Sequence, residues 1–257
     1  MTVKFFRYMT GDLRHMMFSR MTQTLRYGCL WLAVLGPCAS GHAHDAISAE
    51  ARKVYLSRLD ELARTGQSTA AASVRANAWL EMGKTLDEIR GLLNEDIISH
   101  GKTQGLETSV LVNMLNASVH KLQLSPQTRL YLSDLRPYRE ALALDPRGKQ
   151  AALARFLLFK HHFYDSFVDH PLKPLRQSKE ELIEMITFGE SLMTARDPGI
   201  DSEEVHFILG VHYLQALEFG TLPKAKCQSR VAEIQKKFRS QWPTSLKLAT
   251  LEALSAP

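Results

Sequence analysis

Two histidines and two aspartates near the middle of the chain have the residue types and the spacing of a metal site. They are His161, His162, Asp165 and Asp169. Side chains three or four positions apart share one face of a helix, so Asp165 lies one turn from either histidine and one turn from Asp169. Imidazole and carboxylate groups are ligands of zinc and iron, and the spacing therefore predicts a divalent-metal site. The alternative is a polar last turn of a helix, where these side chains are solvated or pair with each other.

A second candidate is the motif Glu203-Glu204-Val205-His206. Di-iron carboxylate bundles use Glu-x-x-His twice and add a glutamate from each of two other helices. One copy makes Glu203 and His206 candidate metal ligands. The alternative is that His206 fills a partly buried core position and that Glu203 complements the free N–H groups of a helix N-terminus.

His44 is a third candidate ligand, because export processing could expose it. Cleavage after Ala43 would leave His44 first, with its amine and ring nitrogen available to copper. Cleavage after Gly41 would instead leave a histidine in third place, which suits square-planar Cu(II) or Ni(II).

Motifs for nucleophilic catalysis or phosphate binding are missing from the sequence. It has no Gly-x-Ser-x-Gly elbow and no glycine-rich phosphate loop. Cys227 stands among Lys224, Lys226 and Arg230, whose charges could lower the pKa of its thiol, or it is a lone surface cysteine in a polar turn. We therefore nominate no catalytic residue and no cofactor other than the alternative divalent metal.

Residues 1–43 have the character of a leader. A short positive segment (21–26), an apolar run (28–35) and a small-residue tail (37–43) predict an export signal cleaved near Ala43, with the true start at Met21. The apolar run is far below the roughly 20 residues that span a bilayer, so we expect a soluble mature chain in the periplasm or outside the cell, without a transmembrane segment. The alternatives are a lipoprotein modified at Cys38 and import of the chain into an organelle.

The charge of the chain argues against nucleic acid as a partner. The net charge of +5 is carried mostly by the leader, where five basic residues stand against one acidic residue: Lys4, Arg7, Arg14, Arg20, Arg26 and Asp12. The remaining chain is nearly neutral and has little long-range field with which to hold a phosphate backbone.

Helical periodicity dominates after residue 44, and strand signals are nearly absent. The pattern, together with prolines at the boundaries, predicts helices at about 48–64, 68–82, 85–101, 107–121, 126–135, 137–144, 149–168, 179–195, 202–219, 224–240 and 244–254. Gly83 is the expected stop of the second helix, and the third and eighth are expected to begin with capping boxes, Thr85 to Glu88 and Ser178 to Glu181. Short connections between such helices imply antiparallel neighbours, hence one all-α domain, 44–257, of stacked helical hairpins or an irregular bundle.

Three fragments resemble parts of the tetratricopeptide repeat. Tyr138, Ala141 and Pro146 match its closing half, and its opening half is matched by Trp79, Met82, Gly83 and Leu86, and by Leu209, Gly210 and Tyr213 with His206 in the tryptophan position. No complete repeat of roughly 34 residues can be laid end to end. The resemblance implies stacked hairpins, with small residues where helices approach closely, and a concave face that binds peptides or proteins. We therefore expect a non-enzymatic protein-binding or scaffolding module, the alternative being a periplasmic metal-binding protein.

Overall fold

The chain folds as helices, as the sequence predicts. The computed structural model describes residues 47–100, 106–118, 122–169, 178–195 and 197–255, and of residues 99–100, 106–108 and 167–169 it describes the backbone alone. The helices are α2 (Ala49–Gln67), α3 (Ala72–His100), α4 (Leu106–Ala117), α5 (Arg136–Leu144), α6 (Ala151–Asp169), α7 (Lys179–Met193), α8 (Ser202–Glu218), α9 (Lys224–Gln241) and α10 (Leu246–Ser255). Two short antiparallel strands, β1 (Gln123–Leu124) and β2 (Tyr131–Leu132), lie between α4 and α5. None of the helices in the described ranges has the length and apolar character needed to cross a bilayer.

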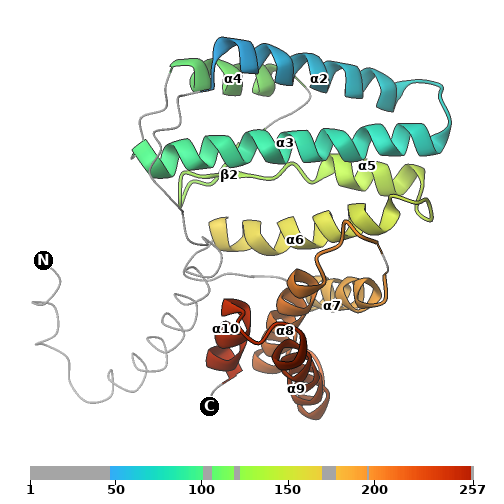
Figure 1. Ribbon diagram of the computed structural model, residues 1–257, viewed down its shortest axis with the longest axis vertical. Helices are drawn as coiled ribbons and strands as arrows, with labels where there is room; N and C mark the ends of the chain where they lie inside the picture. Colours follow the sequence, from blue (N-terminus) through green and yellow to red (C-terminus); the bar gives the residue numbers. More distant parts are fainter. Residues whose placement is uncertain (1–46, 101–105, 119–121, 170–177, 196, 256–257) are drawn as a thin grey trace, which may run out of the picture.

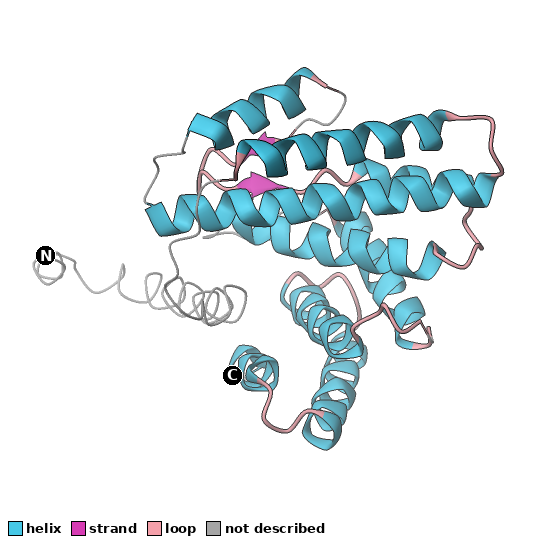
Figure 2. Ribbon diagram, turned by 45° about the horizontal axis from the view of Figure 1, so that its top comes forward, coloured by secondary structure: helices cyan, strands magenta, loops and turns pink. Residues whose placement is uncertain are grey.

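Apart from α4 and α10, the order of the described helices in space follows their order in the chain. The helices α2, α3, α5 and α6 lie side by side, and α7, α8 and α9 continue the series (Figure 1). Helix α4 lies against α2, and α10 packs on α8 and α9 (Figures 1 and 2). The all-α prediction is confirmed, and the contacts between successive helices fit a helical bundle.

Two apolar clusters hold these helices together, and α6 takes part in both. One cluster is built around Leu80, Ile89 and Tyr138, from α3 and α5, and includes Ala154 of α6. The other cluster joins α6 to α10 and contains Phe163 of α6. Different sides of α6 therefore face different neighbours, one side toward α3 and α5 and another toward the C-terminal helices.

Helix α3 is continuous, so the predicted break at Gly83 is wrong. The Thr85 hydroxyl donates to the Glu81 carbonyl within the helix, at 2.9 Å, and does not begin a capping box. Gly83 lies under Tyr138, where a Cβ atom would be 2.6 Å from Cε1 of that ring. The glycine thus serves a close helix approach, and packing overrides its tendency to end a helix.

The predicted helix at 126–135 is also wrong, because this segment is extended and turned. The Ser125 N–H donates to the Leu130 carbonyl at 2.8 Å, and Arg129 has a φ of 63° inside the turn. Asn94 of α3 holds the end of the turn: the Tyr131 N–H donates to its Oδ1 at 2.7 Å, and its amide donates to the Tyr131 carbonyl at 3.0 Å. One side chain thereby satisfies both backbone groups of Tyr131 and fixes β2 on α3.

The predicted capping box at the start of α7 is confirmed. The Glu181 N–H donates to Ser178 Oγ at 3.1 Å, and the Ser178 N–H donates to Glu181 Oε2 at 2.9 Å. The small residues of the repeat-like fragments also lie at close contacts, since a Cβ on Gly210 would be 2.9 Å from Leu251. Local chemistry fixes helix starts here, and glycines set the distances between helices.

Candidate functional site

Three helices bring five polar side chains together in what we call the α3–α6 polar cluster, which consists of Asp87, Arg90, Tyr138, His161 and Asp165. His161 Nε2 lies 2.7 Å from Asp87 Oδ2, and the Tyr138 hydroxyl donates to the same oxygen. The Tyr138 and His161 rings stack, with centroids 5.9 Å apart and planes 10° apart. One carboxylate oxygen thus holds α5 and α6 against α3.

Arg90 connects the two carboxylates of the cluster. Its Nε lies 3.4 Å from Asp87 Oδ1, and its Nη1 lies 3.7 Å from Asp165 Oδ1. The second oxygen of Asp165 accepts the Ser133 N–H at 2.9 Å. The guanidinium therefore compensates both acids in a largely buried place, where an unpaired charge would be costly.

The pKa values of the two acids in the cluster are shifted in opposite directions. Burial disfavours the charge on Asp87, but the hydrogen bond and charge of His161, with Arg90 and Tyr138, outweigh it and hold the pKa of Asp87 below its usual value. Burial raises the pKa of Asp165, against the opposing effects of Arg90 and the Ser133 N–H. An Asp–His pair can move a proton, but here the partners of Asp87 all come from the fold itself, which makes the cluster a junction between helices.

The residues predicted to bind metal at the end of α6 do not share a ligand centre. His161 faces Asp87, and Asp165 faces Arg90 and Ser133. His162 is partly buried, and this burial lowers its pKa. The side chain of Asp169, like the whole of His44, lies outside what the structure describes, so both stay predictions. Within the described residues no group of three or more His, Cys, Asp or Glu side chains is placed to hold a metal ion, and Arg90 would repel a cation beside Asp165.

Glu203 and His206 also turn toward different partners. Glu203 accepts a hydrogen bond from the Ser245 hydroxyl. His206 is fully buried, and its Nδ1 lies 2.5 Å from the Ser202 carbonyl oxygen. The centroid of its ring lies 5.6 Å from that of Trp242. Glu204, which lies between Glu203 and His206 in the motif, was not among the predicted site residues. It is buried, accepts from the Tyr164 hydroxyl and pairs with Lys247 Nζ at 2.5 Å, and so joins α6, α8 and α10.

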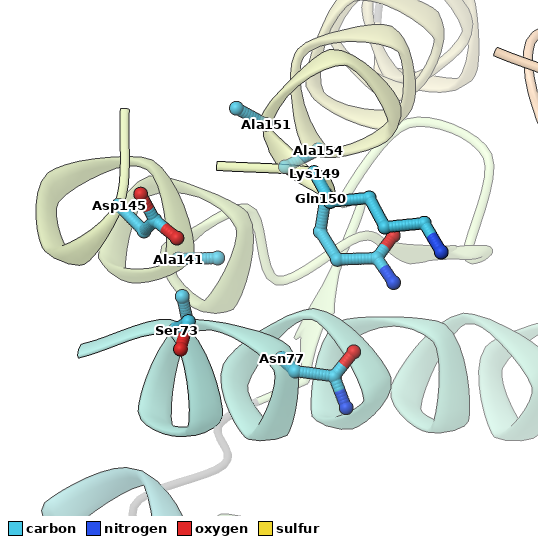
Figure 3. A pocket seen from close by; sticks show the side chains of 9 residues that line it. Ser73, Asn77, Ala141, Asp145, Lys149, Gln150, Ala151 and Ala154 are labelled. Carbon is cyan, nitrogen blue, oxygen red and sulfur yellow. The ribbon is translucent and has the colours of Figure 1, made fainter. Parts of the chain in front are cut away.

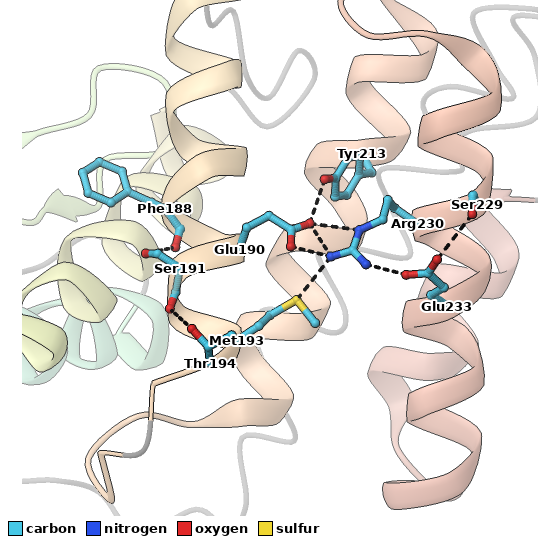
Figure 4. Close-up of polar contacts among 9 residues, drawn as sticks. All are labelled: Phe188, Glu190, Ser191, Met193, Thr194, Tyr213, Ser229, Arg230 and Glu233. Carbon is cyan, nitrogen blue, oxygen red and sulfur yellow. Dashed lines mark hydrogen bonds and ion pairs between the residues drawn. The ribbon is translucent and has the colours of Figure 1, made fainter.

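A further ion pair joins α7, α8 and α9 (Figure 4). Arg230 of α9 donates through Nε to Glu190 Oε1 at 3.0 Å and forms a second bond through Nη2, while the Tyr213 hydroxyl donates to the same carboxylate at 2.7 Å. Burial opposes the charge of Glu190, yet the bonds from Arg230 and Tyr213 hold its pKa below the usual value. The sequence pattern gave no signal for this pairing, because its members lie on three separate helices.

Both sequence-based interpretations of Cys227 are wrong. The thiol is buried in the first turn of α9, on the side of the helix that also carries Val231, Ile234 and Phe238. Burial raises the pKa of Cys227, and the nearby charge of Lys226 lowers it by less. A protonated, covered thiol is a poor nucleophile.

A small cavity of about 190 Å³ lies where α3 meets the corner between α5 and α6 (Figure 3). Its apolar floor is made of Ala76, Ala141, Ala151 and Ala154, and its polar rim of Ser73, Asn77, Asp145, Lys149 and Gln150. The side chains of the rim make no hydrogen bond or ion pair with any other residue that the structure describes. No motif marks these residues in the sequence, and the cavity was not predicted.

Comparison with known proteins adds no assignment: no protein-family model, curated protein or solved structure matches the chain. The acids that lie between the helices are paired within the fold, whereas the rim of the cavity offers unused donors and acceptors. We therefore regard the α3/α5/α6 cavity as the candidate functional site.

Proposed function

We propose that the chain is a non-enzymatic binding module that holds a segment of a protein or peptide partner at the α3/α5/α6 cavity. The observation that carries this proposal is the contrast between the rim and the interior. The acids Asp87, Glu190 and Glu204, which lie between helices, each have a partner within the fold, while the rim side chains have none among the described residues. Polar groups that the fold leaves unpaired at a concavity are available to a partner.

The size and chemistry of the cavity favour a peptide over a metabolite. A volume of about 190 Å³ is below the roughly 300–1,000 Å³ of small-molecule sites, but it admits one side chain of a docked segment. The amides of Asn77 and Gln150 each present a donor and an acceptor, as a peptide backbone does, and Asp145 and Lys149 add one charge of each sign.

Two further features support this function. The close contacts at Gly83 and Gly210 support a helical-hairpin architecture of the tetratricopeptide kind, which displays surfaces of this sort. The signal-like segment 21–43 supports a role in the periplasm or outside the cell. Mass spectrometry of the mature N-terminus tests the second point: a first residue near His44 supports export and cleavage, and an intact Met1 contradicts it.

The test of the binding site is selection of peptides from a displayed library, followed by titration of the selected peptides. Changing the two rim amides to acids, Asn77→Asp with Gln150→Glu, keeps their shape but replaces donors with negative charge. We expect affinity to fall about tenfold or more, the equivalent of one or two lost hydrogen bonds.

The matched control makes the same chemical change away from the cavity, at the exposed residues Asn113 and Gln228. Asn113→Asp with Gln228→Glu should leave peptide affinity unchanged. Peptides that bind the rim variant as tightly as the parent chain, or a library that yields no saturable binder, would show that the cavity is not a peptide site.

A further inference from the structure

The positive charge of the folded chain is concentrated on one helix. Residues 44–257 contain 27 basic and 26 acidic side chains, so they are close to neutral. Helix α9 nevertheless carries six basic residues, Lys224, Lys226, Arg230, Lys236, Lys237 and Arg239, against Glu233 alone. The rest of the domain is correspondingly acidic, and α9 is the basic pole of an otherwise neutral protein.

Three lysines on the exposed side of α9 have no described acid paired with them, because the one acid of this helix, Glu233, pairs with Arg230. Arg230 is used in the pair with Glu190, and Arg239 pairs with Glu252 at 2.8 Å. Lys224, Lys226 and Lys236 are exposed and form no ion pair with any described residue. We call these three residues the α9 lysine face.

Both turns that flank α9 expose a large apolar side chain. Phe219 is 50% exposed at the end of α8, a few residues before α9 begins. Leu246 is 70% exposed at the start of α10, just beyond the end of α9. The apolar side of α9 itself is covered by α8 and α10, which form the end of the bundle with it (Figure 1). The three lysines therefore lie along a helix of about 27 Å, at 1.5 Å for each of its 18 residues, and the two exposed apolar side chains lie in the segments next to its ends.

We propose that the α9 lysine face, with Phe219 and Leu246 at its ends, docks the protein on an anionic lipid surface. Lysines are point charges on flexible stems, which suits a field of mobile headgroups better than the fixed geometry of one folded partner. Exposed apolar side chains can enter the headgroup region while the lysine stems extend to the phosphates. A polyanion such as nucleic acid would account for the lysines but not for the two apolar side chains.

The experiment measures partitioning of the purified chain onto vesicles of phosphatidylcholine with and without phosphatidylglycerol. We expect binding only to the vesicles that contain phosphatidylglycerol, and its loss in 1 M salt, where the screening length is about 3 Å. The triple variant Lys224→Gln, Lys226→Gln and Lys236→Gln should partition on the order of 100-fold less, since each lysine near such a surface contributes several-fold.

The matched control removes the same charge from other exposed positions, with Lys53→Gln, Arg147→Gln and Lys179→Gln. This control should bind vesicles as the parent chain does. Residues 1–46, which are basic and partly apolar, are the same in all these proteins, so any vesicle binding by that segment is common to them. Equal losses in the two triple variants, no binding to anionic vesicles, or binding to an oligonucleotide in place of vesicles would overturn the proposal.

A second variant tests the apolar contribution: Phe219→Ser with Leu246→Ser should weaken vesicle binding and keep its salt dependence. Unchanged binding by this variant would also overturn the proposal as stated. The rim variant of the cavity should still bind vesicles, and the lysine variant should still bind peptides, so the two sites can fail independently.

Discussion

We predict that mild acid destabilises the fold through His212. This residue lies on α8 and is fully buried between Phe159 and Phe163, with ring centroids 5.7 and 5.6 Å from its own. Its Nδ1 lies 3.1 Å from Gln215 Oε1, and its Nε2 has no hydrogen-bond partner. Burial lowers the pKa of His212 from 6.5 to about 4, so the folded chain holds this imidazole neutral while the unfolded chain protonates it readily.

The size of the effect follows from the two pKa values. Because the unfolded chain takes up the proton first, the stability is complete above pH 6.5 and is lost as the pH falls toward the folded pKa of about 4. At about 1.4 kcal/mol per pH unit, the full loss is about 3 kcal/mol, of which about 2 kcal/mol appears between pH 7.5 and 5. The pKa values of His162 and His206 are also lowered by burial, so these histidines add to the loss.

The assay is urea unfolding of the parent chain and of His212→Asn at several pH values between about 5 and 7.5. Asparagine keeps a donor near the Nδ1 position but cannot titrate, so the variant should lose less stability on acidification by about 2 kcal/mol. Phe159→Leu, next to the same ring, is the control: it should lower stability at every pH and leave the pH dependence intact. If His212→Asn loses as much stability between pH 7.5 and 5 as the parent chain, His212 is not the source of acid sensitivity.

Three further predictions concern single side chains. Gly83→Ala would place a Cβ 2.6 Å from the Tyr138 ring and should lower the free energy of unfolding in urea by about 1–3 kcal/mol. Gly91→Ala is the control in the same helix, since its Cβ would meet nothing within 4 Å and the change should be neutral or stabilising. Equal effects of the two substitutions would contradict the close approach of Tyr138 to Gly83. Arg230→Met should lower the free energy of unfolding, measured by thermal unfolding, by about 1–2 kcal/mol, because the Arg230–Glu190 pair is partly exposed and its contribution should lie between those of exposed and buried ion pairs. A smaller loss would show that the pair contributes little. Cys227 should react with an aromatic disulfide reagent only after unfolding, and fast reaction of the folded chain would show that the thiol is not covered.

The sequence predicted those parts of the fold that depend on local chemistry. The start of α7 follows from Ser178 and Glu181, which satisfy each other's backbone N–H groups without help from other helices. The break at Gly83 failed because its reason lies 55 positions away, in the ring of Tyr138. The helix expected at 126–135 failed for a similar reason, since Asn94 of α3 fixes the extended backbone of Tyr131.

No motif marks the α3/α5/α6 cavity in the sequence, and the partners of the predicted metal ligands could not be predicted either. The sequence correctly placed His161 and Asp165 on one helix, but spacing on a single helix does not say what the facing helix supplies. Here α3 supplies Asp87 and Arg90, which turn the group into an ion network. The alternative stated for these residues, pairing at a polar turn, was nearer to the structure, although His161 pairs with a residue of another helix.

The same argument explains why the cavity and the α9 lysine face, and not the acid–base clusters, are the places to look for function. A charged group inside a bundle must find a partner in the fold, because leaving it unpaired costs several kcal/mol, and the largely buried acids Asp87 and Glu204 both satisfy this requirement. A polar group at the surface is under no such pressure, since water serves as its partner. Charge and hydrogen-bonding capacity concentrated there without compensation, as at Lys224 or Gln150, are not needed for folding. Function in this chain is therefore best sought where the fold leaves such groups unpaired.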